Sequence, residues 1–162
     1  MKKIVYISGA LTDMSEEERA KMRRFYEELG EICKLFGFEV YLPHIYGDPK
    51  FVAHLAPKQI DRIDRLAVTQ SYLVVACVGI SSTGVGIEIE LAYHANKPVI
   101  LLYEQKKLNE RRISRLVRGN PAVVSHIVYE SFDDAKVKLD AFLKEFCRSI
   151  VAENALPPLL SL

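Results

Sequence analysis

The chain has 162 residues, of which 49% are hydrophobic and 27% are charged, and its formal net charge is +1. This length suits a single domain with a full hydrophobic core, and the near-neutral charge implies no general attraction to nucleic acid polymers or membrane surfaces. The three widely separated cysteines argue against a disulfide scaffold and suit a reducing, cytoplasmic environment.

Apolar runs and amphipathic stretches alternate along the chain. The apolar runs predict strands at 2–8, 38–42, 73–78, 98–103 and 126–129. The amphipathic stretches predict helices at 16–36, 57–70, 85–96, 109–118 and 132–150. Short, nearly all-apolar strands joined by helices are typical of a parallel sheet covered on both faces. We therefore predict an α/β fold, a single-domain doubly wound sheet of five parallel strands in the order 2-1-3-4-5.

The segments outside these elements give weaker signals. The loop at 43–57 has a length often seen in functional covers. The domain is expected to span residues 1–150, followed by an apolar C-terminal tail at 151–162 that packs on the domain or meets a second subunit. We expect no signal peptide and no membrane span, because the N-terminus leads straight into a strand and no apolar run is long enough. The histidines show no metal-ligand spacing, so we expect no metal. We also expect no cofactor.

The turn after the third predicted strand, Ser81 to Glu88, is the most informative segment. A strand, a turn of small residues and a helix point free backbone N–H groups and a helix dipole at a ligand above the sheet. Helical periodicity places Glu88 on the side of Leu91 and Ala92, which should face the sheet. A carboxylate on that side is costly unless it is paired or used, so we interpret Glu88 as functional. The alternative is a partly exposed carboxylate that stabilises the start of the helix.

Three loops should meet beyond the carboxyl ends of the strands, where ligands bind in such sheets. They are 8–13 after the first strand, 43–46 after the second and 81–86 after the third. Their small residues and hydroxyl groups suit a phosphate or a sugar, and Gly84 and Gly86 allow close approach to the backbone. The first of these loops lacks the G-x-G-x-x-G pattern, which excludes a dinucleotide-binding fingerprint.

Together these motifs resemble the nucleoside 2-deoxyribosyltransferase-like superfamily, and most closely its 2′-deoxynucleoside 5′-monophosphate N-glycosidases, from Lys3 to about Phe146. The matching segments are Tyr6-Ile7-Ser8-Gly9, Val40-Tyr41-Leu42-Pro43-His44, Ser82-x-Gly84-Val85-Gly86-x-Glu88, Asn96-Lys97-Pro98-Val99-Ile100 and Ser114-Arg115-Leu116-Val117-Arg118-Gly119. In addition, Asp64 precedes Glu88 by 24 residues, a separation similar to that of this branch's acidic pair.

The resemblance implies a homodimeric enzyme that cleaves the N-glycosidic bond of a nucleotide. Glu88 would attack the anomeric C1′ carbon, Asp64 would act as acid or base near the leaving nucleobase, and Tyr6 would orient Glu88. Ser82 and Gly84 would hold the 5′-phosphate, and Ser114 would reach the site of the neighbouring subunit. The full set of implied substrate-binding residues is Ser8, Gly9, Ala10, Thr12, His44, Ser82, Gly84, Gly86 and Ser114.

The sequence also departs from this family. Members usually carry a serine and an arginine just past the first glycine, where this chain has Ala10 and Thr12, so a bidentate phosphate clamp is absent there. The 5′-phosphate requirement, the nucleobase and the choice between ribose and 2-deoxyribose therefore stay open. Two other functions also stay open: exchange of bases between nucleosides, and non-catalytic nucleotide binding or sensing.

Overall fold

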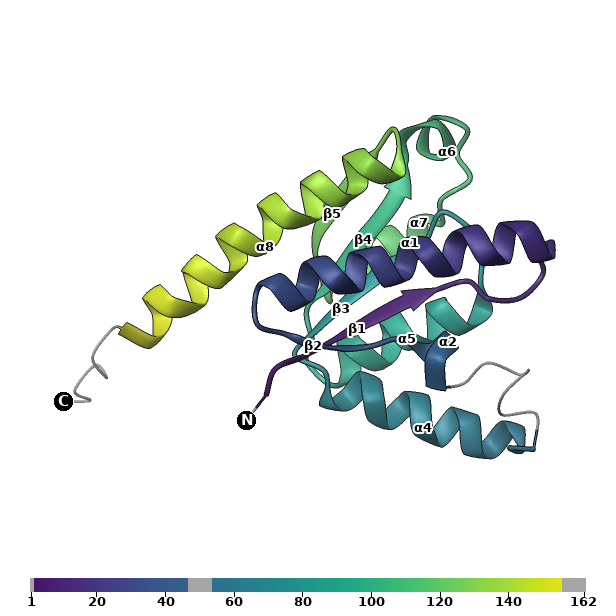
Figure 1. Ribbon diagram of the computed structural model, residues 1–162, viewed down its shortest axis with the longest axis horizontal. Coiled ribbons are helices and arrows are strands. Elements are labelled where there is room, and N and C mark those ends of the chain that lie inside the picture. The colour runs from purple at the N-terminus through teal and green to yellow at the C-terminus, as the bar shows by residue number, and fades with distance from the viewer. Residues whose placement is uncertain (1, 47–53, 156–162) are drawn as a thin grey trace.

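The computed structural model describes residues 2–46 and 54–155, with the backbone alone for 151–155. Five parallel strands form one sheet in the order β2-β1-β3-β4-β5 (Figure 1). They are β1 (Ile4–Gly9), β2 (Glu39–Tyr41), β3 (Leu73–Cys77), β4 (Val99–Glu104) and β5 (Val123–Tyr129). The predicted fold class and strand order are confirmed.

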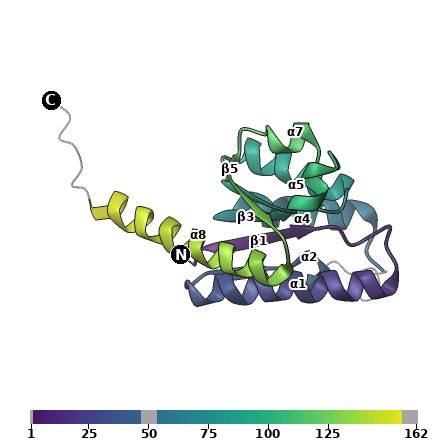
Figure 2. The same cartoon turned by 90° about the horizontal axis from the view of Figure 1, so that it is seen from above.

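Helices cover both faces of the sheet (Figure 2). One face carries α1 (Glu16–Leu35) and α8 (Phe132–Ala155), and the other carries α4 (Pro57–Gln70) and α5 (Thr83–His94). Three short helices lie in the connections: α2 (Pro43–Tyr46), α6 (Gln105–Asn109) and α7 (Arg115–Arg118). No helix within the described ranges combines the length and apolar character needed to cross a bilayer.

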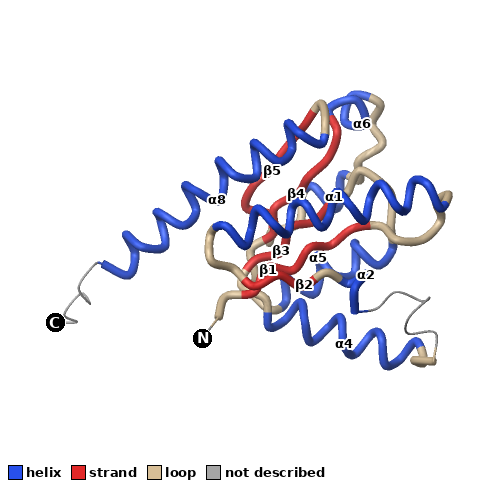
Figure 3. The backbone as a smooth tube through the Cα atoms, in the orientation of Figure 1, coloured by secondary structure: helices blue, strands red, loops and turns tan. Residues whose placement is uncertain are grey.

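The alternation of side chains along β1 creates two separate cores. Val5 and Ile7 pack with α1 and α8, whereas Tyr6 packs on the opposite face with residues of α4 and α5. Successive residues of a strand point to opposite faces, so Ser8 lies on the same face as Tyr6. The strands and their connections are traced in Figure 3, where the carboxyl ends of β1 and β3 lead into loops and that of β4 leads directly into α6, all at one edge of the sheet.

The predicted helix at 109–118 is wrong. The chain forms α6 and α7 instead, because Arg111 adopts a left-handed conformation (φ 58°) that a helix interior does not allow. Ser114 then starts α7 as its N-cap, with its hydroxyl accepting from the Val117 N–H.

Several other boundaries also differ from prediction. α5 begins at Thr83, because Ser82 is its N-cap, and α8 continues to Ala155. β5 begins at Val123, three residues earlier than predicted, since Val123 already pairs with Val99 of β4. The predicted 43–57 loop begins with α2, while its segment 47–53 and the tail from 156 to 162 lie outside the described residues.

Candidate active site

Glu88 lies one turn inside α5 and faces the sheet, as the helical periodicity predicted. Its neighbours on that side, Val85, Ile89 and Ala92, are buried. The Tyr6 hydroxyl donates to Glu88 Oε1 over 2.7 Å, and the Ser8 hydroxyl donates to Oε2. Each carboxylate oxygen therefore has its own hydroxyl donor from β1, a pattern that fixes the orientation of the group.

Burial sets the protonation behaviour of this cluster. It raises the pKa of Glu88 to about 7. The hydrogen bonds from the Ser8 and Tyr6 hydroxyls lower this pKa, and the charge of the nearby Asp64 raises it. Burial, followed by the charges of Glu88 and Asp64, also raises the pKa of Tyr6 well above its usual range. Tyr6 therefore stays a hydrogen-bond donor at any ordinary pH. Glu88 exchanges its proton near neutrality, a property common among catalytic carboxylates.

Asp64 approaches the cluster from α4. It precedes the fully buried Val68 by four residues, so both side chains point toward the sheet. Burial raises the pKa of the Asp64 carboxyl, a polar contact with the Tyr41 hydroxyl lowers it, and the Asp61 charge raises it. The structure therefore brings together Tyr6, Ser8, Asp64 and Glu88 from β1, α4 and α5.

Tyr41 belongs to this cluster although it was absent from the predicted site. It pairs with Tyr6 in the β1–β2 register, and the two rings stack with centroids 5.3 Å apart and planes 14° from parallel. The signal was present in the sequence, because both tyrosines lie in predicted strands. Each taken alone is most simply a core residue, and only the register of the sheet places their rings together.

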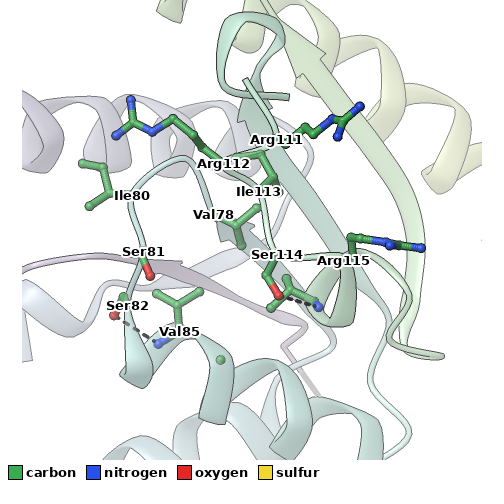
Figure 4. A pocket seen from close by; sticks show the side chains of 12 residues that line it. Val78, Ile80, Ser81, Ser82, Val85, Arg111, Arg112, Ile113, Ser114 and Arg115 are labelled. Carbon is green, nitrogen blue, oxygen red and sulfur yellow. Dashed lines mark hydrogen bonds between the residues drawn. The ribbon is translucent and has the colours of Figure 1, made fainter. Parts of the chain in front are cut away.

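A cavity of about 380 Å³ opens between the start of α5 and the segment leading into α7 (Figure 4). Its polar lining includes Ser81, Ser82 and Ser114, and the Ser82 and Ser114 hydroxyls each accept a backbone N–H as helix caps. Gly86 leaves the backbone open there, since a Cβ at this position would meet nothing within 4 Å. The remaining lining residues are apolar or basic: Val78, Ile80, Val85, Ile113, Val117, Arg111, Arg112 and Arg115. The cavity thus combines hydroxyl groups with positive charge at its rim.

The predicted residues around the β1 loop have structural partners elsewhere. A Cβ at Gly9 would lie 2.2 Å from the Tyr26 ring, so glycine is needed there for packing against α1. Ala10 is buried, and its carbonyl accepts a hydrogen bond of 3.2 Å from the Tyr26 hydroxyl. Thr12 is exposed.

His44 and Gly84 also lie apart from the Glu88 hydrogen bonds. His44 is buried on the α1 side, with Nε2 2.9 Å from Glu27 Oε1. Gly84 lies in the exposed first turn of α5, where its nearest side-chain atom is Ser82 Oγ. Across 2–46 and 54–150, no three His, Cys, Asp or Glu side chains gather as metal ligands.

Several solved protein structures are similar to this chain. A CMP N-glycosidase, BcmB, from Clostridium botulinum is 26% identical over 86% of this chain and 99% of its own, with a TM-score of 0.63. The solution structure of BlsM is 24% identical over 99% of this chain and 98% of its own (TM-score 0.66). A 2-deoxyribosyltransferase from Bacillus psychrosaccharolyticus is 16% identical over 84% of this chain and 95% of its own (TM-score 0.57). No family model matches the chain, and no curated protein matches it significantly.

Proposed function

We propose that this nucleoside 2-deoxyribosyltransferase-like enzyme hydrolyses the N-glycosidic bond of a nucleoside or 2′-deoxynucleoside 5′-monophosphate. The products are the free base and ribose or deoxyribose 5-phosphate. One observation carries the proposal: the half-buried Glu88 carboxylate, aligned by the Tyr6 and Ser8 hydroxyls beside a second acid, Asp64. The 26% likeness to a CMP N-glycosidase supports the same reaction class.

The chemistry proceeds by double displacement. A Glu88 oxygen attacks C1′ while the C1′–N bond breaks, and the base departs with that electron pair and a proton from Asp64. Water then attacks C1′ of the glycosyl-enzyme ester, Asp64 takes a proton from the water, and Glu88 leaves as a carboxylate. Both carboxyl groups return to their starting states, so the cycle needs no cofactor.

The raised pKa values of the two acids fit these roles. Glu88 must be ionised to attack, and its pKa of about 7 allows this from neutral pH upward. Asp64 must carry a proton when the base leaves, and burial raises the pKa of its carboxyl in the required direction. We expect a bell-shaped dependence of the rate on pH, because turnover requires ionised Glu88 and protonated Asp64 in the same molecule.

The cavity at the start of α5 supports a 5′-phosphate on the substrate. The Ser81 and Ser82 hydroxyls offer donors and the empty space beside Gly86 allows close approach, while Arg112 and its neighbours supply positive charge that Ala10 and Thr12 do not. We propose that Ser82, Gly84 and Gly86 contact this phosphate.

The proposed homodimer, with Ser114 lent to the neighbouring site, has its own test. If Ser114 acts in the neighbouring site, mixing inactive Glu88→Ala with weakened Ser114→Ala subunits restores one complete site per heterodimer. If it acts within its own subunit, mixing restores nothing.

Two alternatives remain distinguishable by product analysis. Base exchange between nucleosides is favoured by the likeness to a 2-deoxyribosyltransferase, and it differs only in the acceptor that resolves the intermediate. A non-catalytic nucleotide-binding or sensing role is motivated by the missing clamp in the β1 loop.

The test is incubation with a panel of nucleotides and nucleosides, with and without added free base, followed by chromatography. Hydrolysis releases base without an acceptor, whereas transfer requires one. Calorimetric binding without base release, unchanged in Glu88→Ala, would establish the sensing role and refute the enzyme.

A further inference from the structure

Two polar atoms of the cluster around Glu88 lack a hydrogen-bond partner among the described residues. They are the Tyr41 hydroxyl oxygen and Asp64 Oδ1, and both are buried. Burying either atom without a partner is unfavourable. The two groups face each other closely enough for the hydroxyl to lower the pKa of the Asp64 carboxyl. A small adjustment that closed this contact would satisfy both atoms at once.

The fold leaves the Tyr41 hydroxyl little freedom. On one side the ring stacks on Tyr6, and on the other it stacks on Tyr46 with centroids 4.8 Å apart and planes 17° from parallel. A ring held between two others keeps its plane, so the direction of its hydroxyl bond is fixed by β2. The side chain of Asp64 is shorter and adjusts more easily.

We propose that Tyr41 is a positioning residue for Asp64: its hydroxyl donates a hydrogen bond to the Asp64 carboxyl group and aims the remaining oxygen at the leaving nucleobase. The inference rests on the proposed function, because it assigns Tyr41 a task in that reaction. It parallels the arrangement at Glu88, where Tyr6 donates to one oxygen of the carboxylate. Adjacent tyrosines of β1 and β2 would then each orient one of the two acids.

The charges around Asp64 give this bond a measurable signature. Tyr41 from β2, Tyr6 from β1 and Glu88 from α5 face it, together with Asp61 from its own helix. None of these groups is a cation, so the Tyr41 hydroxyl is the group among them that favours the ionised form of Asp64. Removing that hydroxyl leaves burial and the Asp61 charge in place, and the pKa of Asp64 rises further.

The first experiment measures this pairing without turnover. Tyr41→Phe keeps the ring and the stack and removes only the hydroxyl oxygen. We expect carbon-13 NMR titration of the Asp64 carboxyl to show a higher pKa in Tyr41→Phe than in the wild-type protein. Tyr72→Phe is the control, because Tyr72 is also half-buried but packs on the opposite face with Phe38 and Phe146. An Asp64 titration that is unchanged in Tyr41→Phe would overturn the pairing.

The second experiment tests positioning through kinetics. We expect kcat of Tyr41→Phe to fall about tenfold, part of the full contribution of a general acid, with KM within about twofold. The limb of its pH profile that reports the ionisation of Asp64 should move upward with the pKa of that carboxyl. In an Asp64→Asn background the same change should cost nothing further, because the two residues act as one unit.

An additive loss in the double variant would show that Tyr41 acts independently of Asp64 and would overturn the inference. A wild-type protein that releases no base would instead refute the proposed function, while the NMR titration would still decide the pairing.

Discussion

The two faces of the sheet are built from the same strands but differ in chemistry. The face covered by α1 and α8 is closed by apolar and aromatic packing, with Phe25 stacked on Phe132 at 3.9 Å between ring centroids. The face covered by α4 and α5 begins the same way, but near the carboxyl end of β1 it accepts Ser8 and Glu88. The Tyr6 and Ser8 hydroxyls receive the Glu88 carboxylate on this face, whereas the buried side chains of the other face are mainly apolar and aromatic.

The sharpest test of this division is removal of the carboxylate itself. We expect Glu88→Ala to lower kcat for base release a thousandfold or more while the fold is retained, because the glycosyl-enzyme ester cannot form. Base release is followed by chromatography, and circular dichroism reports the fold. Glu90→Ala is the matched control from the same helix, where Glu90 is exposed and contacts Asn120 and His94. Unchanged turnover in Glu88→Ala would refute the assigned role.

The opposite result is expected from the apolar face. Leu139 of α8 is fully buried in the core shared with α1, and Leu139→Ala should lower the free energy of unfolding by about 3 kcal/mol through lost contacts and a residual cavity. Urea titration measures this loss. Turnover per folded molecule should remain within about twofold. A large loss of turnover at unchanged stability would break the comparison between the two faces.

The buried Glu88 carboxyl should also lower the free energy of unfolding of the protein at neutral pH. Burial raises the pKa of Glu88 in the folded protein to about 7 from an ordinary value of 4.5, so ionisation of this carboxyl disfavours the folded state. Glu88→Gln removes this cost. We expect the stability advantage of Glu88→Gln over the wild-type protein to grow by on the order of 2 kcal/mol between about pH 4.5 and pH 7. Above pH 7 this difference in the free energy of unfolding should stay constant. A difference that does not change with pH would show that Glu88 is well solvated.

The smallest expected effect comes from one donor to Glu88. Ser8→Ala removes a hydrogen bond that lowers the pKa of Glu88, so that pKa rises and the limb of the pH profile that reports Glu88 ionisation moves upward. We expect kcat near neutrality to fall about tenfold, the cost of about one charge-assisted hydrogen bond. Ser71→Ala is the control, since that buried hydroxyl donates only to the Val68 carbonyl. A pH profile identical to that of the wild type would mean that Ser8 does not tune Glu88.

The sequence was informative where local periodicity and burial agree. The apolar runs located all five strands, and the helical period placed Glu88 toward the sheet. The break at Arg111 was not predictable, because a left-handed residue without a glycine or asparagine leaves no local signal. The packing of Gly9 against Tyr26 was equally hidden, since that contact depends on how α1 lies on β1.

The aromatic neighbours of the site were missed for a related reason. Tyr41 in a short strand is most simply a core residue, and its proximity to Asp64 depends on the docking of α4 against β2. His44 was predicted as a substrate-binding residue, and its partner Glu27 becomes apparent only when α2 is packed beside α1. Contacts between elements distant in sequence carry this information, and single-residue patterns do not.

Gly86 offers a practical opportunity for redesign. Its backbone is in an ordinary helical conformation and the space where a side chain would begin is empty, so the helix has room for a Cβ there. Alanine, serine and valine at this position would fill the adjoining cavity in graded steps without straining the chain. Position 86 therefore allows the size of this cavity to be varied by substitution while both carboxyl groups, which do not line it, stay unchanged.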